Sequence, residues 1–312
     1  MKFSNLARTA LMGLAAFATL ASAQRTPPPV IKPLLQIGLV ADAGHPGMGD
    51  GRIHRVNVLT GAFLGDFGMG CLGNTNSIDV QPSTGVAYVA DAAAIKKFDV
   101  KTGAYLGYLV LGSTLGGTID KIRFTSAGDL YAIVGQGYIP NTYKLFRLNA
   151  TTGAVVGSSI PMQGKGTPSM GLGFRPDGRV EVNSTYEGDT YIDSFTPDAK
   201  YTGYDYISGL WSVYRTSNDR VFRWLPSGMQ TAYGMVGDLS LGGSFLANIA
   251  TNSPVLFAEG AGHYVYALSL EGSYQPYIYR FNANGTPSLN NQYWANPFSV
   301  VNLVDMSVYV GP

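Results

Sequence analysis

One phrase of this sequence occurs three times, and each copy joins an apolar segment, a Thr-Gly turn and a short segment ending in Gly. The copies are RIHRVNVLTGAFLG from Arg52, AIKKFDVKTGAYLG from Ala94 and KLFRLNATTGAVVG from Lys144. Apolar residues that alternate with polar ones on both sides of such a turn predict a β-hairpin. Hairpins that return at a fixed period predict a radial or solenoidal all-β array.

The period of the array predicts its architecture. The same hairpin position is occupied by Val56, Phe98, Leu148, Phe195 and Phe281. These markers imply a period of about 45 residues, with one marker lost between the last two, and this period is typical of a four-stranded propeller blade. We therefore predict an all-β, six-bladed β-propeller. Seven blades remain the alternative, because the segment from Leu210 to Ile249 is the least regular.

The two ends of the predicted propeller complement each other. The first unit offers only three strands, whereas an extra strand pattern, Leu303 to Val310, follows the last unit. We expect this C-terminal strand to complete the first blade, because such a closure removes the open sheet edges that invite aggregation.

The repeat resembles that of a known group of proteins. The pattern Ile-x-x-Phe-Asp-x-x-Thr-Gly from Ile95 to Gly103, together with turns such as Pro176-Asp177-Gly178, resembles the NHL-repeat and YVTN-type propellers, which include secreted bacterial members. Relatives with lactonase activity hold a divalent ion in the channel through carboxylate and amide side chains. The resemblance implies that role here for a set of channel candidates, namely Asn76, Asp91, Asp120, Asn183 and Glu187.

The N-terminus has the pattern of an export signal. Lys2 and Arg8 precede an apolar run, and Ala21-Ser22-Ala23 fits a signal-peptidase site. We predict a signal peptide over 1–23, a Pro-rich leader over 24–33 and a single propeller over 34–312. A membrane anchor is the alternative, but the run is shorter than the ~20 residues of a span. The mature chain is therefore expected to lack a membrane span and to be secreted, periplasmic or at the cell surface.

Composition narrows the possible partners. The formal net charge is +1, which gives no electrostatic argument for nucleic acid. Cys71 is the one cysteine, so no internal disulfide can form, and we expect it to be a buried small apolar residue. We also expect a monomer whose partner is a protein or a polysaccharide.

Long loops suggest where a ligand could bind. The connections between second and third strands are extended in several units, and long loops on a rigid scaffold often carry function. Their aromatic, imidazole and carboxylate side chains suit neutral, polyhydroxylated or peptide ligands. The candidate ligand-binding residues are His45, Tyr138, Tyr186, Glu187, Glu271 and Tyr274.

One loop also contains candidate metal ligands. Asp42 and Asp50 flank a Gly-rich segment and offer oxygen ligands of the kind that Ca²⁺ takes. Their spacing matches no EF-hand, and two carboxylates fall short of the ~6–8 ligands of that ion. No cofactor is expected otherwise, with Ca²⁺ or another divalent ion as the alternative.

Three functions fit this sequence. The first is an exported propeller that binds a ligand or a protein partner through its loop-rich face, without evident catalysis. The second is a metal-dependent, lactonase-like hydrolase or lyase with a channel site, which would depend on Asp120 or Glu187. The third is a structural surface or matrix protein. No catalytic residue is assigned, because neither Gly-x-Ser-x-Gly nor His-Glu-x-x-His occurs.

Overall fold

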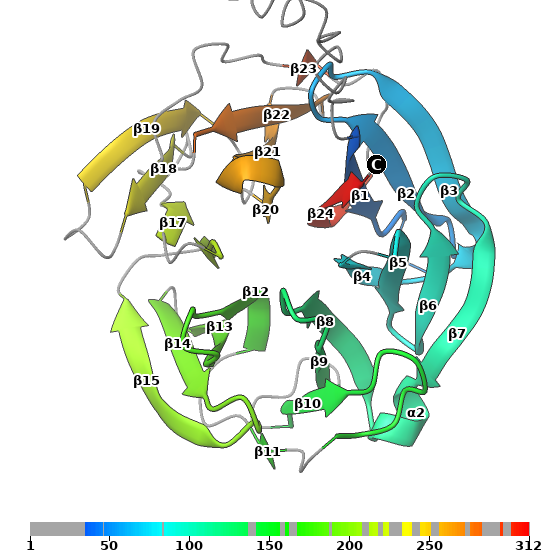
Figure 1. Cartoon of the computed structure of the whole chain (residues 1–312), viewed down its shortest axis with the longest axis vertical. Helices are drawn as coiled ribbons and strands as arrows, with labels where there is room; N and C mark the ends of the chain where they lie inside the picture. The colour runs from blue at the N-terminus through cyan, green and yellow to red at the C-terminus, as the bar shows by residue number, and fades with distance from the viewer. Residues whose placement is uncertain are drawn as a thin grey trace, which may run out of the picture. The chain divides into compact units, whose positions relative to one another are not determined.

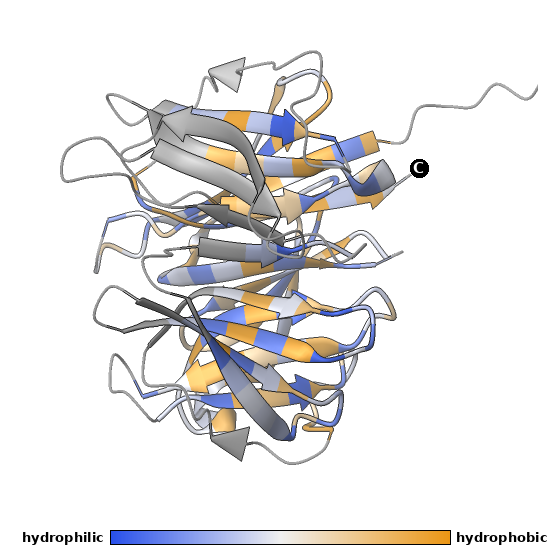
Figure 2. Cartoon of the chain, turned by 90° about the vertical axis from the view of Figure 1, so that its left-hand side faces the viewer, coloured by the Kyte–Doolittle hydropathy of each residue, from blue (hydrophilic) through white to orange (hydrophobic). Residues whose placement is uncertain are grey.

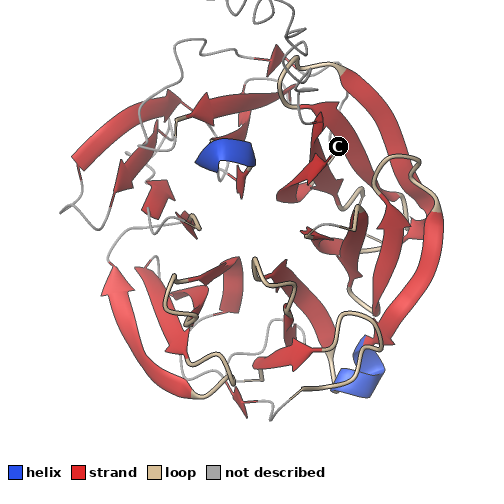
Figure 3. Cartoon of the chain, viewed as in Figure 1, coloured by secondary structure: helices blue, strands red, loops and turns tan. Residues whose placement is uncertain are grey.

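The computed structural model describes most of the chain beyond the predicted leader. The described residues are 35–45, 47–82, 84–136, 142–156, 160–161, 167–186, 189–207, 212–217, 221–224, 233–238, 244–250, 256–271, 275–282, 294–295 and 301–311. They belong to one compact unit, Leu34–Gly311. In the part described, the two helical segments α2 (Gly112–Leu115) and η2 (Ala261–His263) are short, and the other regular elements are β-strands (Figure 3). No described helix is long and apolar enough to span a membrane.

Five four-stranded antiparallel sheets, the blades, follow one another around a common centre (Figure 1). Blade 1 is β24 (Leu303–Gly311), β1 (Leu35–Asp42), β2 (Gly51–Asn57) and β3 (Phe63–Leu72). Blade 2 is β4 (Thr75–Gln81), β5 (Val86–Asp91), β6 (Ala94–Asp99) and β7 (Tyr105–Leu111). Blade 3 is β8 (Thr118–Phe124), β9 (Leu130–Gly135), β10 (Lys144–Leu148) and β11 (Ile160–Pro161).

The remaining strands complete the unit. Blade 4 is β12 (Thr167–Phe174), β13 (Val180–Tyr186), β14 (Asp189–Phe195) and β15 (Tyr201–Ile207). The fifth blade is β20 (Leu256–Glu259), β21 (Val265–Glu271), β22 (Gln275–Phe281) and β23 (Trp294–Ala295). Two separate hairpins lie between these blades in sequence, β16 (Ser212–Arg215) with β17 (Val221–Trp224) and β18 (Tyr233–Asp238) with β19 (Ser244–Ala250).

The prediction of six blades, and its alternative of seven, is wrong because the fold has five. The irregular segment 212–250 does supply four strands, as the repeat period requires. They pair two by two, β16 with β17 and β18 with β19, and among the described residues no ladder joins the two pairs. The period counts strands along the chain, whereas a blade also requires backbone hydrogen bonds between its second and third strands.

The predicted closure of the first blade is confirmed. β24 pairs antiparallel with β1 from Gly311 opposite Leu35 to Leu303 opposite Asp42, with one register shift near Asp42. A C-terminal strand thus becomes the innermost strand of the N-terminal blade (Figure 1). The pairing satisfies the backbone groups of β1 that would otherwise form an exposed edge.

The repeated Thr-Gly phrase encodes a single turn structure. In blade 2 the Asp99 side chain accepts hydrogen bonds from the backbone N–H of Thr102 at 2.7 Å and from its hydroxyl at 2.8 Å. Gly103 then takes a φ of +75°, which suits glycine because it has no Cβ. The matching bonds of Asn57 and Asn149 form the same turn in blades 1 and 3. The repeat is therefore an Asx turn that ends one hairpin strand and starts the next.

The core consists of clusters of buried apolar side chains that the strands contribute. One cluster joins Tyr88 and Ile95 of blade 2 with Ile119 and Phe146 of blade 3. Figure 2 shows the underlying pattern, with apolar and polar residues alternating along many strands. Cys71 does not belong to this core: contrary to expectation it is exposed, in a part of β3 where the ladder to β2 is interrupted between Gly51 and Ile53.

Candidate functional site

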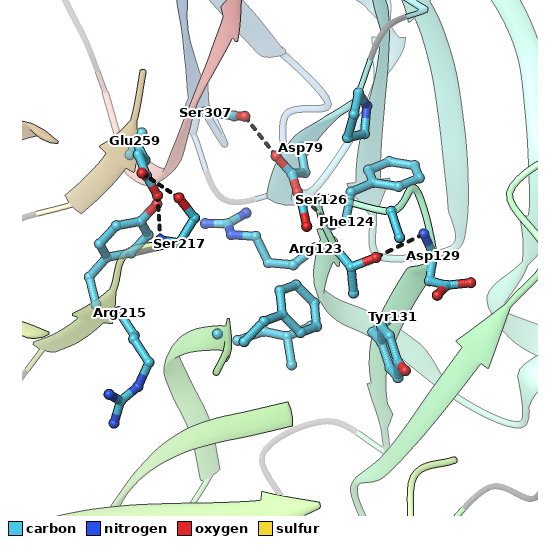
Figure 4. Close-up of a pocket in the computed structure, with 18 of the residues that line it drawn as sticks. Asp79, Arg123, Phe124, Ser126, Asp129, Tyr131, Arg215, Ser217, Glu259 and Ser307 are labelled. Carbon is cyan, nitrogen blue, oxygen red and sulfur yellow. Dashed lines mark hydrogen bonds between the residues drawn. The ribbon is translucent and has the colours of Figure 1, made fainter. Parts of the chain in front are cut away.

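A cavity of about 610 Å³ lies where the innermost strands converge (Figure 4). Its walls come from five blades and from one hairpin, because residues at the carboxyl ends of β4, β8, β12, β16 and β20 meet residues of β24. Its aromatic lining residues are Phe124, Tyr131, Phe174, Tyr214 and Phe257, and its charged ones are Asp79, Arg123, Asp129, Arg175, Arg215 and Glu259. A volume of this size and a mixed lining are typical of small-molecule sites.

The cavity and the predicted binding loops lie at opposite ends of the inner strands. In blade 2, Asp79 and Pro82 line the cavity at the carboxyl end of β4. The connection after the second strand starts at Asp91, which pairs with Thr75 at the other end of β4. The candidate loops are connections of this second type, so the cavity lies away from the loops predicted to bind a ligand.

Asp305 of β24 forms the centre of a buried ion-pair network. Arg123 of β8 donates to it in a bidentate arrangement, with Nη2 to Oδ1 at 2.6 Å and Nη1 to Oδ2 at 2.8 Å. The Ser77 hydroxyl and the backbone N–H of Ile78 also donate to Oδ2. Burial alone would raise the pKa of Asp305, but the charges of Arg123 and Lys121 and these hydrogen bonds hold it at about 2. The network ties β24, β4 and β8 together inside the ring.

Asp79 lies beside this network and also joins three strands. Its carboxylate accepts from the backbone N–H of Phe124 at 2.6 Å, from the Ser307 hydroxyl at 2.7 Å and from the Val80 N–H at 2.9 Å. Burial raises the pKa of Asp79, and the Arg123 charge offsets this only in part. Figure 4 shows Arg123 extending between Asp79 on one side and Ser217 and Glu259 on the other.

A second charged group lies at the blade 4 side of the cavity. Arg215 of β16 binds Glu181 of β13 through Nε to Oε2 at 2.8 Å and Nη2 to Oε1 at 3.0 Å. Arg175, in the turn after β12, approaches the same carboxylate only to 3.5 Å. That distance is beyond the usual hydrogen-bond range. Glu181 thus binds Arg215 closely through both of its oxygens, and Arg175 shares it weakly.

Ser217 and Glu259, which line the cavity, meet His263, but the three do not form a catalytic triad. Glu259 accepts from the Ser217 backbone N–H and hydroxyl, both at 2.7 Å, and lies 2.7 Å from Nδ1 of His263. The serine oxygen lies 3.1 Å from that same nitrogen. A triad places the acid and the nucleophile on different ring nitrogens, so that the base can relay a proton. This arrangement instead fixes the segment of Ser217 to the η2 turn.

The predicted metal ligands Asp42 and Asp50 have separate partners. Asp42 is buried and accepts from the backbone N–H groups of Gly44, Val301 and Asn302. Burial alone would raise its pKa, but the hydrogen bond with His54 and those from the backbone lower it to about 2. Asp50 instead binds His45, Oδ2 to Nδ1 at 2.8 Å and Oδ1 to the backbone N–H at 2.7 Å. Within the described ranges, no three His, Cys, Asp or Glu side chains gather to hold a metal ion.

The other candidate ligand-binding residues fall largely outside the described structure. Tyr138, Glu187 and Tyr274 lie outside the described residues. Tyr186 ends β13 and Glu271 ends β21, at the end of the ring opposite the cavity, without a described side-chain environment. Their role in binding stays a prediction, as does that of His45.

Two of the channel candidates implied by the resemblance, Asn76 and Asp91, have side-chain contacts with the protein. Asn76 donates from Nδ2 to the Ile119 carbonyl at 2.9 Å. Asp91 accepts from the backbone N–H groups of Gly73 and Asn74 and binds Lys96. Burial raises the pKa of Asp120, and Lys121 offsets this in part. Asn183 is buried in β13.

Sequence reasoning missed Asp79, Arg123, Asp305 and Arg175. The first three are charged residues inside otherwise apolar inner-strand patterns, as in Ile78-Asp79-Val80 and Ile122-Arg123-Phe124. A charge in such a strand requires a buried partner or a polar cavity. That signal was available, but the partner cannot be read from the sequence.

Comparison with solved structures supports the propeller fold. No protein-family model matches the sequence, and no curated protein matches it. A Bacteroides caccae protein of unknown function aligns with a TM-score of 0.61 at 11% identity, over 88% of this chain and 98% of that one. A candidate 6-phosphogluconolactonase from Bacteroides fragilis aligns with a TM-score of 0.57 at 12% identity, over 91% and 100%. A chain of a nidogen/laminin complex gives 0.59 at 10% identity, over 88% and 98%.

These identities show the fold alone. The structural neighbours are β-propellers, which include lactonase-like proteins. The resemblance drawn from the repeats is therefore confirmed for the propeller fold, and the specific NHL family stays a prediction.

Proposed function

We propose that this chain is a binding propeller whose cavity takes a small polar ligand. The observation that carries this proposal is the 610 Å³ cavity itself, lined by five aromatic side chains and by polar groups from the inner strands and the turns that follow them. Aromatic faces stack on rings or on the C–H faces of sugars, while a few polar groups orient the ligand.

The contacts of the lining carboxylates favour binding over catalysis. Asp79 is bound by two backbone N–H groups and Ser307, and Glu259 is bound by Ser217 and His263. Groups that are held by protein partners serve better as a fixed polar lining than as proton carriers. The N-terminal signal pattern supports a further part of this proposal, namely that the protein is exported.

The test is a substitution that fills the cavity without straining the fold. A Cβ added to Gly173, which lines the cavity, would meet only the Cβ of Arg215 at 3.9 Å. Gly173→Leu should therefore fold and occlude the site. Gly73→Leu is the matched control, because its Cβ likewise meets its nearest atom at 3.9 Å, the Asp91 carboxylate.

The readout is the thermal unfolding of the purified protein with a panel of neutral and acidic saccharides. A ligand at a hundredfold excess over Kd stabilises the folded state by about 2.7 kcal/mol. The expected result is a shift in the parent and in Gly73→Leu, and none in Gly173→Leu. An equal shift in Gly173→Leu would contradict binding in the cavity. Consumption of a sugar lactone, added as one further compound, would replace binding by hydrolysis.

A further inference from the structure

Two of the three arginines that line the cavity are already committed to protein carboxylates. Arg123 binds Asp305 in a bidentate pair at 2.6 and 2.8 Å, and it also donates to the Ile78 carbonyl at 2.8 Å. Arg215 binds Glu181 in a second bidentate pair at 2.8 and 3.0 Å. Each pair is close to neutral, so neither arginine offers a free charge to a ligand.

Arg175 is the exception. Its guanidinium lies 3.5 Å from Glu181, whose two oxygens are both taken by Arg215, and 27% of its side chain is exposed. The nearby turn adds Arg179, which is paired with Asp177 at 2.7 Å. Arg215 and Arg179 thus each have a close carboxylate partner, and Arg175 is the arginine of this group that has none within 3.0 Å.

We propose that the ligand of the cavity carries a carboxylate that Arg175 binds, and that it is an acidic monosaccharide of the uronate type. This inference rests on the proposed function, since it names the ligand class of the same site. A single weakly paired guanidinium matches one carboxylate in geometry, because its planar donors pair with two oxygens. A phosphate dianion would bring a second negative charge into a cavity that Asp79, Asp129 and Glu259 also line.

The rest of the cavity suits a sugar ring. Phe174, next to Arg175 in sequence, packs against Tyr131 with ring centroids 5.4 Å apart, and both side chains line the cavity. Such faces stack on the apolar C–H face of a sugar. Ser126 also lines the cavity, and its hydroxyl has no hydrogen bond to a described residue. It is therefore available to a sugar hydroxyl.

The experiment is a calorimetric titration of the purified protein with glucuronate, its methyl ester and glucose. Glucuronate should bind the parent best, and Arg175→Gln should weaken it by roughly 10- to 100-fold, the range for one charge-assisted hydrogen-bonded contact. The ester and glucose should bind parent and variant equally. The affinity of Arg175→Lys for glucuronate should lie between those of the parent and Arg175→Gln, because lysine keeps the charge but lacks the planar fork.

Arg179→Gln is the matched control. It removes a cation from the same turn, and Arg179 does not line the cavity. It should bind glucuronate as the parent does. Unchanged affinity in Arg175→Gln, equal binding of acid and ester, or no binding of glucuronate by the parent would each overturn the carboxylate assignment. Binding that persists in Gly173→Leu would instead overturn the cavity as the site, so the two failures are distinguishable.

Discussion

Two charged groups inside the ring use the same residue types to different effect. Around Asp305, the bidentate Arg123 and donors from β4 satisfy a carboxylate that is 4% exposed. Around Glu181, two arginines compete for one carboxylate, and Arg175 remains weakly paired. The first group joins strands from three blades and stabilises the ring. The second leaves a charge facing the cavity, which is the property that a binding site requires.

The largest effect should follow removal of the strand that carries Asp305. Deleting residues 303–312 takes away the innermost strand of blade 1 together with the partner of Arg123. We expect aggregation or loss of a cooperative unfolding transition, because β1 becomes an open edge and Arg123 loses its counter-charge. Size-exclusion chromatography and a thermal melt measure this. A chain lacking Pro312 alone is the control, and a deletion variant that melts like it would disprove the closure.

Breaking the ion pair alone should cost less than removing the strand. Asp305→Asn leaves the Arg123 charge buried, which typically destabilises a protein by about 3–5 kcal/mol. Urea unfolding measures the loss. Asp177→Asn, in an exposed turn pair, serves as the surface control and should change stability by less than about 1 kcal/mol. Equal effects of the two substitutions would mean that the buried ion pair contributes no more to the free energy of unfolding than the surface pair does.

Acid should weaken this network and, separately, the contacts of Asp42. The folded-state pKa of Asp305 and of Asp42 is about 2, below the usual 3.8, so each carboxylate contributes stability above pH 4 that is lost as the pH falls toward 2. Each contributes roughly 2 kcal/mol. Unfolding free energies measured from pH 5 to pH 2 should fall less steeply in Asp305→Asn and in Asp42→Asn. A slope equal to that of the parent in both variants would contradict this account.

The smallest effect should come from the residue assigned to ligand binding. Arg175→Gln removes a contact of 3.5 Å and leaves Glu181 bound to Arg215, so its stability should stay within about 0.5 kcal/mol of the parent. Arg215→Gln should cost more, since it breaks the bidentate pair. Chemical unfolding of both variants tests this order. A reversed order would show that Arg175, not Arg215, holds Glu181.

The sequence predicted local structure better than assembly. The Thr-Gly hairpin was predictable because Asp99 and Gly103 determine their turn within five residues. The closing strand was predictable from a count of strands per unit. The number of blades was not, because pairing between β17 and β18 depends on backbone geometry that a period does not contain.

The candidate site shows the same limit more strongly. Asp79, Arg123 and Asp305 come from three distant segments, and only the folded ring brings them together. The sequence predicted a ligand site at the other end of the strands, because long loops can be recognised in a sequence whereas a cavity cannot. The signal that the sequence did contain was the presence of charged residues within apolar inner strands, which indicates a buried partner or a polar cavity.

A crystal structure of the protein with bound glucuronate tests the central claim most directly. The account predicts the sugar in the cavity, with its carboxylate on Arg175 and its ring against Phe174 and Tyr131. A sugar bound instead at the opposite end of the inner strands, beside His45 and Asp50, would contradict the account and support the loop-rich face.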